Sequence, residues 1–341
     1  MKILQLISFA LLANGAVTVS FESQKSLEDD SSLTTSLISL HKSLVEYPSI
    51  SGSEGVLPFW PYERRKDEIW GRGTVDAKGS VASQIIAVQS LLESSEIGGD
   101  VALLFVVGEE KGGEGVREAN NIVLSWESVI FGEPTELKLA SVHKGGMGFN
   151  ISAKEKAGHS GYPELRTNAN TMLIKALSGL DSIELPWSDR YGNTSLNIGR
   201  MEAGVATNVI AEYAYATVLI GIAGGDPQTI QELVEKAIHD VSPDVQLNFT
   251  SGRRPVPIDH DIDGFETIVV NYGIDIPSLK GARKRYLYGL GSILVAHSDR
   301  EHLTVSDLVT AVDGYKVLVT AMLKWNILYI KQDVITYRIP K

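Results

Sequence analysis

The sequence contains no cysteine, so it offers neither a disulfide framework nor a thiolate that could act as a nucleophile or metal ligand. It also lacks an apolar run long enough to span a bilayer, which argues against membrane insertion. Basic residues are outnumbered, and the net charge of −11 argues against nucleic acid as a partner, because phosphate binding needs a basic face. The apolar content of 43% is ordinary for a globular protein. Because cysteine is absent, any metal must be bound by oxygen atoms and imidazole nitrogens.

The first twenty residues differ in kind from the rest. Lys2 is followed by an apolar run up to residue 13 and then by small residues up to Ser20. This order is typical of a secretory signal peptide and predicts cleavage between Ala16 and Ser20; a short buried helix is the alternative. We therefore expect a secreted, extracellular protein, and three N-x-S/T acceptor sequences for N-glycosylation agree with that route: Asn150, Asn193 and Asn248.

Hydrophobic periodicity predicts one set of helices and strands at the two ends of the chain and a different set in its middle. Outside the middle of the chain it predicts helices at 31–45, 80–92, from 116 and from 305 to about 325, with apolar strands at 100–107, 128–131, 267–270 and 289–297. That alternation indicates an α/β fold with a central, mostly parallel sheet. In the middle, the order is strand 147–154, helix 169–180, strands 195–200 and 210–222, helix 227–239 and strand 245–250. This β-α-β-β-α-β order resembles a ferredoxin-like α+β domain inserted into the first.

Acidic residues follow the apolar strands in glycine-flanked turns. Asp76 lies between Gly73 and Gly79, and two further acidic turns follow at 109–110 and at Glu133. In an open α/β sheet, ligands bind beyond the carboxyl ends of the strands. Three acidic groups that meet there would repel one another unless a cation lay between them. The sequence therefore predicts a metal site.

The candidate residues each have a second interpretation. Adjacent residues at a strand end point to opposite sides, so one carboxylate of the pair Glu109 and Glu110 could bind metal while the other acts as a general base on metal-bound water; a solvated acidic turn is the alternative. Asp76 could bridge two metal ions or cap the following helix. Glu133 is a further oxygen ligand or a loop charge. His297, after an apolar strand, is a nitrogen ligand or an ordinary histidine.

The motifs Gly71-Arg72-Gly73-Thr74-Val75-Asp76-Ala77-Lys78-Gly79, Gly108-Glu109-Glu110, Gly132-Glu133-Pro134-Thr135, Ala157-Gly158-His159-Ser160-Gly161 and Ala296-His297 together resemble the co-catalytic dizinc metallopeptidases. That family includes glutamate carboxypeptidase, aminoacylase, acetylornithine deacetylase and succinyl-diaminopimelate desuccinylase. The resemblance covers roughly residues 30 to 325, and it is closest to the secreted fungal carboxypeptidase-like members.

The resemblance implies a role for each motif. Asp76 would bridge two zinc ions, Glu109 would be the general base on metal-bound water, Glu110 and His297 would bind one zinc, and Glu133 the other. His159 and Asn208 would hold the carboxylate or oxyanion of the substrate, a peptide or N-acyl amino acid. A homodimer through the inserted domain is a further expectation.

The implied domains are a signal peptide at 1–20, a catalytic domain at 21–143 and 256–326, a lid or dimerisation domain at 144–255, and an unassigned tail at 327–341. The sequence departs from the family near 55–57, where an early segment with a His-x-Asp motif is missing. A lesser departure is Leu290, which stands before Gly291 where the family usually has proline. Losing one imidazole ligand leaves one zinc short of its usual coordination. The expected activity is carboxypeptidase-type hydrolysis. An N-acyl amino acid deacylase and a catalytically impaired remnant are the alternatives.

Overall fold

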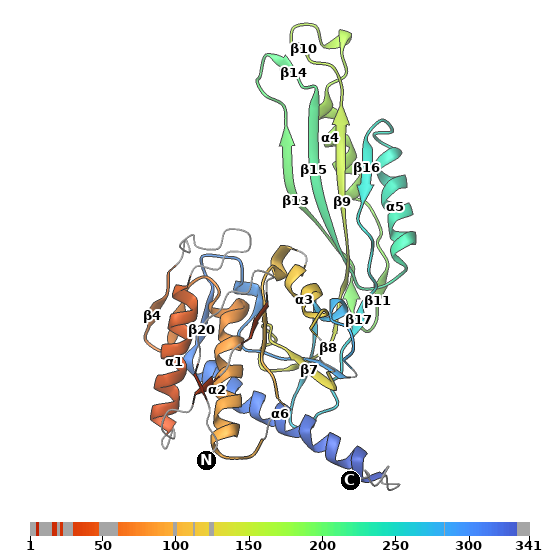
Figure 1. Ribbon diagram of the computed structural model, residues 1–341. Coiled ribbons are helices and arrows are strands. Elements are labelled where there is room, and N and C mark those ends of the chain that lie inside the picture. Colours follow the sequence, from red (N-terminus) through yellow and green to blue (C-terminus); the bar gives the residue numbers. More distant parts are fainter. Residues whose placement is uncertain are drawn as a thin grey trace. The chain divides into compact units, whose positions relative to one another are not determined.

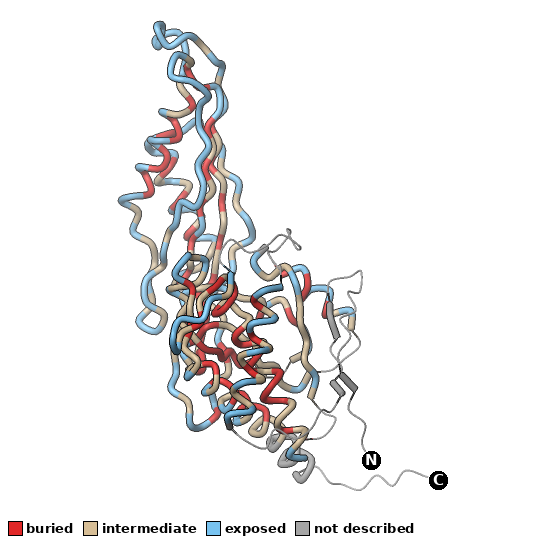
Figure 2. The backbone as a smooth tube through the Cα atoms, turned by 90° about the vertical axis from the view of Figure 1, so that its left-hand side faces the viewer, coloured by how far each residue is buried: buried red, intermediate tan, exposed pale blue. Residues whose placement is uncertain are grey.

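The computed structural model describes residues 5–6, 16–18, 21–22, 30–47, 61–97, 101–111, 113–122, 126–282 and 284–332. The chain divides into two compact units. The first contains Met1–Ser141, Ile258–Ile268 and Ile274–Lys341, and the second contains Val142–Pro257 and Val269–Gly273. The second unit thus extends two residues beyond each end of the insertion expected at 144–255. It also includes Val269–Gly273, which follow later in the chain. Buried residues, red in Figure 2, form a separate hydrophobic core in each unit.

The second unit is built on an antiparallel four-stranded sheet. Its strands are β9 (Gly145–Lys154), β13 (Ser195–Ala203), β15 (Tyr213–Ile222) and β16 (Gln246–Phe249), in the order β13-β15-β9-β16. Helices α4 (Ala169–Leu180) and α5 (Pro227–His239) pack against each other, and α4 packs on β9 and β15 (Figure 1). This β-α-β-β-α-β connectivity confirms the predicted ferredoxin-like insertion.

Local sequence explains these elements. In β9 buried and half-buried residues alternate, so that Met147, Phe149 and Ile151 enter the core while Asn150 lies on the other face. Each helix begins at a side-chain cap: Asn168 accepts from the amide of Asn170, and Asp226 accepts from the amide of Gln228. The alternation of buried and half-buried residues is typical of a strand with one face in the core, and the side-chain caps determine where the two helices begin.

The described part of the first unit contains the α-helices α1 (Asp30–Glu46), α2 (Gly79–Glu93), α3 (Glu114–Ala119) and α6 (Val305–Gln332). The main core lies among α1, α2 and α6, whereas α3 packs in a smaller separate cluster. Helix α2 packs against both α1 and α6. The core includes Leu37 of α1, Ile86 of α2 and Leu318 of α6. The predicted helices are confirmed, and α6 continues into the tail that the sequence left unassigned; residues 333–341 lie outside the described residues.

The strands of the first unit form short pairs among the described residues. They are β1 (Gln5–Leu6) with β3 (Phe21–Glu22), β2 (Ala16–Thr18) with β6 (Leu104–Val106), β7 (Ser128–Phe131) with β19 (Lys284–Leu287), and β4 (Glu63–Arg65) with β5 (Glu68–Trp70) and β20 (His302–Thr304). Strands β7 and β19 run parallel. Strands β8 (Leu139–His143) and β18 (Thr267–Val270) carry the chain between the units, and β17 (Val256–Pro257) pairs with β8.

Two local expectations are wrong. The apolar run at 289–297 is a turn rather than a strand, because Gly291 has a left-handed φ of 73° and Ser292 caps a short 3-10 turn at Ile293–Val295. The stretch before the Asp76 motif also contains the β4–β5 hairpin, although no strand was expected there. Across the part of the chain that the structure describes, no helix meets the length and hydrophobicity needed to cross a membrane.

Candidate metal centre

Asp76 lies in a tight turn that precedes α2. The chain reaches it through Gly71 and Gly73, whose φ angles of 145° and 81° favour glycine, and the turn itself spans Thr74–Lys78. Helix α2 begins after Lys78, so Asp76 does not cap it. The helix-cap interpretation of Asp76 is therefore wrong. The Asp76 side chain remains available to other partners.

Glu109 and Glu110 lie in a 3-10 turn (Glu109–Lys111), not at the end of a strand, because β6 already ends at Val106. Gly108 and Gly113 bracket this turn with left-handed φ angles of 76° and 70°, and the amide of Gly113 donates to the carbonyl of Gly108 over 2.9 Å. The closed loop fixes both glutamates relative to β6. The glycine pair was the visible sequence signal for it.

His297 also has a left-handed backbone, with a φ of 59°. Few non-glycine residues adopt this conformation, and it is concentrated at functional sites. His297 follows the turn Ile293–Val295 rather than the strand expected before it. The Ala296 amide donates to the carbonyl of Ile293, and this contact closes the turn directly before the imidazole.

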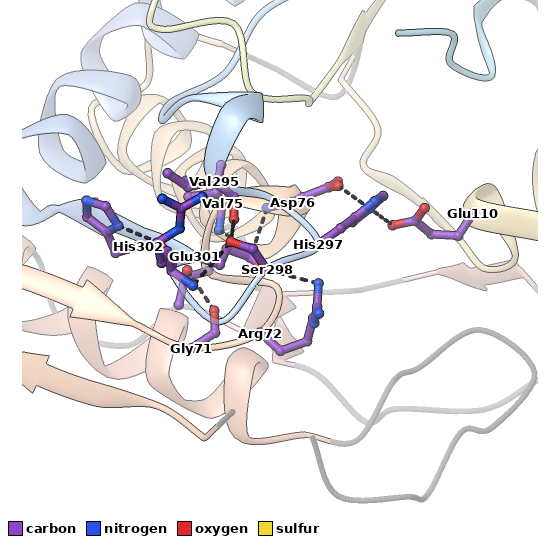
Figure 3. A network of polar contacts seen from close by, with 12 residues as sticks. Gly71, Arg72, Val75, Asp76, Glu110, Val295, His297, Ser298, Glu301 and His302 are labelled. Carbon is purple, nitrogen blue, oxygen red and sulfur yellow. Dashed lines mark hydrogen bonds and ion pairs between the residues drawn. The ribbon is translucent and has the colours of Figure 1, made fainter. Parts of the chain in front are cut away.

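These three elements bring Asp76, Glu110 and His297 together. The Nε2 atom of His297 lies 3.0 Å from Oδ2 of Asp76 and 2.8 Å from Oε1 of Glu110. Figure 3 shows the imidazole between the two carboxylates. One donor atom from each residue lies within 4.8 Å of the others, which is a spacing that a single metal ion can bridge. Residues more than 180 positions apart in the sequence thus share one site.

Glu133 and Glu109 complete the acidic cluster. Burial raises the pKa of Glu133 well above its ordinary value, and the charges of Asp76 and Glu109 act in the same direction. The pKa of Asp76 is also raised, first by burial and then by the charge of Glu110. Burial, followed by the charges of Asp275 and Glu110, raises the pKa of Glu109 to about 7. Carboxyl groups this crowded hold protons unless a cation neutralises them.

The donor set fits a divalent metal. Asp76 and Glu110 supply oxygen and His297 supplies nitrogen, which are the ligand atoms that zinc accepts in a cysteine-free site. Glu133, hydrogen-bonded to Asp76, could supply oxygen to a second ion. Among the described residues of this cluster, His297 is the single imidazole. The set therefore fits one three-ligand site and part of a second.

His159 and Asn208 lie together in the second unit. His159 pairs with Val209 across the short strands β10 (Gly158–His159) and β14 (Val209–Ile210), and the amide of Ser160 donates to the carbonyl of Asn208. The imidazole Nδ1 accepts from the amide of Gly161 over 3.1 Å. The two residues expected to hold substrate therefore share one exposed end of this unit.

Two buried residues at the centre were not expected from the sequence. His41 of α1 is fully buried, and its Nε2 lies 3.2 Å from the carbonyl oxygen of Thr74. Glu301 is buried as well and accepts hydrogen bonds from the amides of Val75 and Asp76. The spacing of four residues between Leu37 and His41, on the apolar face of α1, was a usable signal for His41. No comparable local pattern marks Glu301.

The α/β unit with its cluster of carboxylates and imidazole, joined to a ferredoxin-like insertion, defines the chain as a metal-dependent hydrolase. The model of the peptidase dimerisation domain of the M20 family matches residues 142–246. A probable carboxypeptidase of Aspergillus flavus is 45% identical over 304 residues, covering 79% of this chain and 70% of that protein. A probable carboxypeptidase of Aspergillus niger is 44% identical over 316 residues, covering 81% and 76%. The chain belongs to the M20 metallopeptidases.

Solved structures agree on the fold. An M20 family metallo-carboxypeptidase from Sulfolobus solfataricus superimposes with a TM-score of 0.60 at 17% identity, covering 76% of this chain and 79% of that one. At such low identity the likeness concerns architecture alone. It confirms an α/β catalytic domain with an inserted α+β domain.

Proposed function

We propose that this chain is a secreted, zinc-dependent carboxypeptidase that hydrolyses a peptide bond near the free carboxylate of its substrate. The convergence of Asp76, Glu110 and His297 on one point carries the proposal. The names of the fungal relatives, probable carboxypeptidases at 42–45% identity, support the substrate class.

In this proposal Asp76, Glu110 and His297 would hold one zinc ion, and Glu133 with Asp76 would hold a second. When bound, zinc supplies Lewis acidity, which polarises a carbonyl group and acidifies water. The left-handed turn at His297 and the glycine-closed loop at Glu110 hold the two ligands in place from opposite ends of the sequence. Positioning by such rigid turns lowers the reorganisation that binding requires.

Glu109 is the proposed proton acceptor. Its pKa of about 7, raised mainly by burial, means that its carboxylate can take a proton near neutral pH and return it to a leaving amine. Its neighbour Glu110 instead contacts His297, so the two adjacent glutamates have different partners. This division gives one glutamate to the metal and leaves the other for proton transfer.

His159 and Asn208 are proposed to bind the substrate's carboxylate or the oxyanion. Both lie at the exposed end of the second unit, where His159 can present its Nε2 while Nδ1 accepts from Gly161. The match to a dimerisation domain supports a homodimer through this unit. In a dimer, His159 would serve the neighbouring subunit.

Secretion is part of the same proposal. Of the three acceptor asparagines, Asn193 and Asn248 are exposed, whereas Asn150 is half-buried in β9 opposite Thr217 and Asn248. An oligosaccharide needs a free surface position. We therefore propose Asn193 and Asn248 as the sites of N-glycosylation and expect Asn150 to be modified little.

The Glu109→Gln variant tests the catalytic proposal. It keeps the shape of the side chain and removes its capacity to accept a proton, so peptide hydrolysis should fall at least 100-fold while bound zinc is retained, in line with the usual contribution of a general base. Glu118→Gln, an exposed change in α3, is the matched control and should keep wild-type activity.

The substrates separate the alternatives. Cleavage of C-terminal residues from peptides supports the carboxypeptidase, and cleavage of N-acyl amino acids alone would make the chain a deacylase. Because the described cluster has one imidazole, an impaired remnant is the third candidate. A wild-type protein that binds zinc and hydrolyses neither substrate would establish the remnant and overturn the proposal.

A further inference from the structure

Glu301 is a buried carboxylate outside the proposed ligand set. It lies four residues after His297 and directly before β20, and its side chain is 1% exposed. Carboxylates are almost never this buried unless their oxygens have partners. The partners of Glu301 come from the turn that carries Asp76.

The contacts join Glu301 to the turn at several points. Its Oε1 accepts from the amide of Val75 at 3.0 Å and from the amide of Asp76 at 3.2 Å. The amide of Gly71 donates to the Glu301 backbone carbonyl over 3.1 Å. The other carboxylate oxygen, Oε2, lies 3.5 Å from Nη1 of Arg72. Figure 3 shows Glu301 beside this turn, on the side of Asp76 away from Glu110.

The amide contacts constrain the backbone on which the proposed ligand stands. Asp76 and Ala77 have non-helical backbone angles, and the bond from the Lys78 amide to the Gly73 carbonyl closes the turn around them without using the amides of Val75 and Asp76. A side chain that accepts two consecutive amides supplies the missing partners and fixes the direction of the intervening peptide. The backbone of Asp76 is thereby held in one position, from which its carboxylate reaches His297.

We propose that Glu301 is a positioning residue for the metal site: by accepting the amides of Val75 and Asp76, it holds the Asp76 carboxylate where Glu110 and His297 converge. The proposal rests on the proposed function, in which Asp76 binds metal. Glu301 itself lies outside the donor set of Asp76, Glu110 and His297. The reach of its oxygen to the two amides is what matters, rather than the negative charge.

Two conservative variants separate reach from charge. Glu301→Gln keeps an acceptor oxygen at the same distance from the backbone, and Glu301→Asp keeps the charge but withdraws the oxygen by one methylene. We expect zinc affinity, measured by competition with a chelator, to stay within about threefold of wild type in Glu301→Gln and to fall about 10- to 100-fold in Glu301→Asp, the usual cost of disturbing the partners of a ligand. The absorption spectrum of bound Co²⁺ should change only in Glu301→Asp.

Leu318→Ala is the control for general destabilisation. Leu318 is fully buried in α6 within the same core, so its truncation should lower the melting temperature while the zinc affinity stays at the wild-type value. Equal zinc affinity in Glu301→Asp and wild type would overturn the proposal, as would equal losses in the Gln and Asp variants or in Leu318→Ala. If the wild-type protein binds no zinc, the proposed function fails first.

Discussion

His41 should make the protein sensitive to mild acid. The imidazole is fully buried in α1 beneath the Asp76 turn, and burial lowers its pKa from 6.5 to about 4. Because the Thr74 carbonyl accepts a hydrogen bond, Nε2 at 3.2 Å carries the proton of the neutral ring. A second proton on Nδ1 would place a charge in the core, where the described residues offer this atom no hydrogen-bond partner.

The size of the effect follows from the difference between the two pKa values. As the pH falls, the unfolded chain takes up a proton near pH 6.5, whereas the folded chain does so only near pH 4, so the free energy of unfolding decreases in between. For this one group the loss is about 2 kcal/mol between pH 7 and pH 5, and about 3 kcal/mol in total below pH 4. Above pH 7 the contribution of His41 to the pH dependence vanishes.

The measurement compares wild type with His41→Gln by urea unfolding at pH 7 and at pH 5. Glutamine does not titrate, and its amide nitrogen can donate to the Thr74 carbonyl as Nε2 does. Other groups titrate alike in both proteins, so the variant should lose about 2 kcal/mol less than wild type over this range. Equal losses in the two proteins would refute the buried, neutral state assigned to His41.

Two further predictions concern the loop of Glu109 and Glu110 and the route of export. Gly113→Ala should destabilise the protein by about 1–3 kcal/mol more than Gly281→Ala, because both glycines have left-handed φ angles but only at Gly113 would a Cβ lie 2.0 Å from Oδ1 of Asp275. Equal melting temperatures in the two variants would contradict the close packing of this loop. When the protein is secreted from a eukaryotic host, Asn193→Gln should lower its apparent mass by one oligosaccharide, and Asn150→Gln should leave the mass unchanged. The first residue found by N-terminal sequencing of the secreted protein should lie between 17 and 21, and an intact Met1 would refute secretion by cleavage.

The ferredoxin-like unit could be predicted closely from the sequence. Helices α4 and α5 have the bounds that the sequence pattern predicted, 169–180 and 227–239, because local spacing and local capping determine them. The strand β9 is similar: its alternation records which face is buried. In these elements, neighbouring residues carry the information.

The apolar stretch before His297 shows where such inference fails. A short apolar run is compatible with a strand or a turn of helix, and Gly291 and Ser292 decide for the turn. The partner of each strand was not predictable either: β7 pairs in parallel with β19, which lies far along the chain. Pairing partners depend on distant segments, which a local pattern does not specify.

The site was predictable in part. Motifs marked Asp76, Glu110 and His297 as candidates, and the structure brings them to one point. Glu301 carried no signal, because its contacts with Val75 and Asp76 span more than 220 residues of sequence. A lone glutamate among polar residues looks solvent-exposed until the fold buries it.

Zinc titration of the wild-type protein and of His297→Ala tests the metal centre most directly. His302→Ala is the matched control, since this nearby imidazole stacks on Trp70 outside the cluster. We predict that wild type and His302→Ala bind zinc equally and that His297→Ala loses at least 100-fold in affinity, more than the loss of a supporting partner would cause. Equal zinc binding in all three proteins, or none in wild type, would contradict a metal centre formed by Asp76, Glu110 and His297.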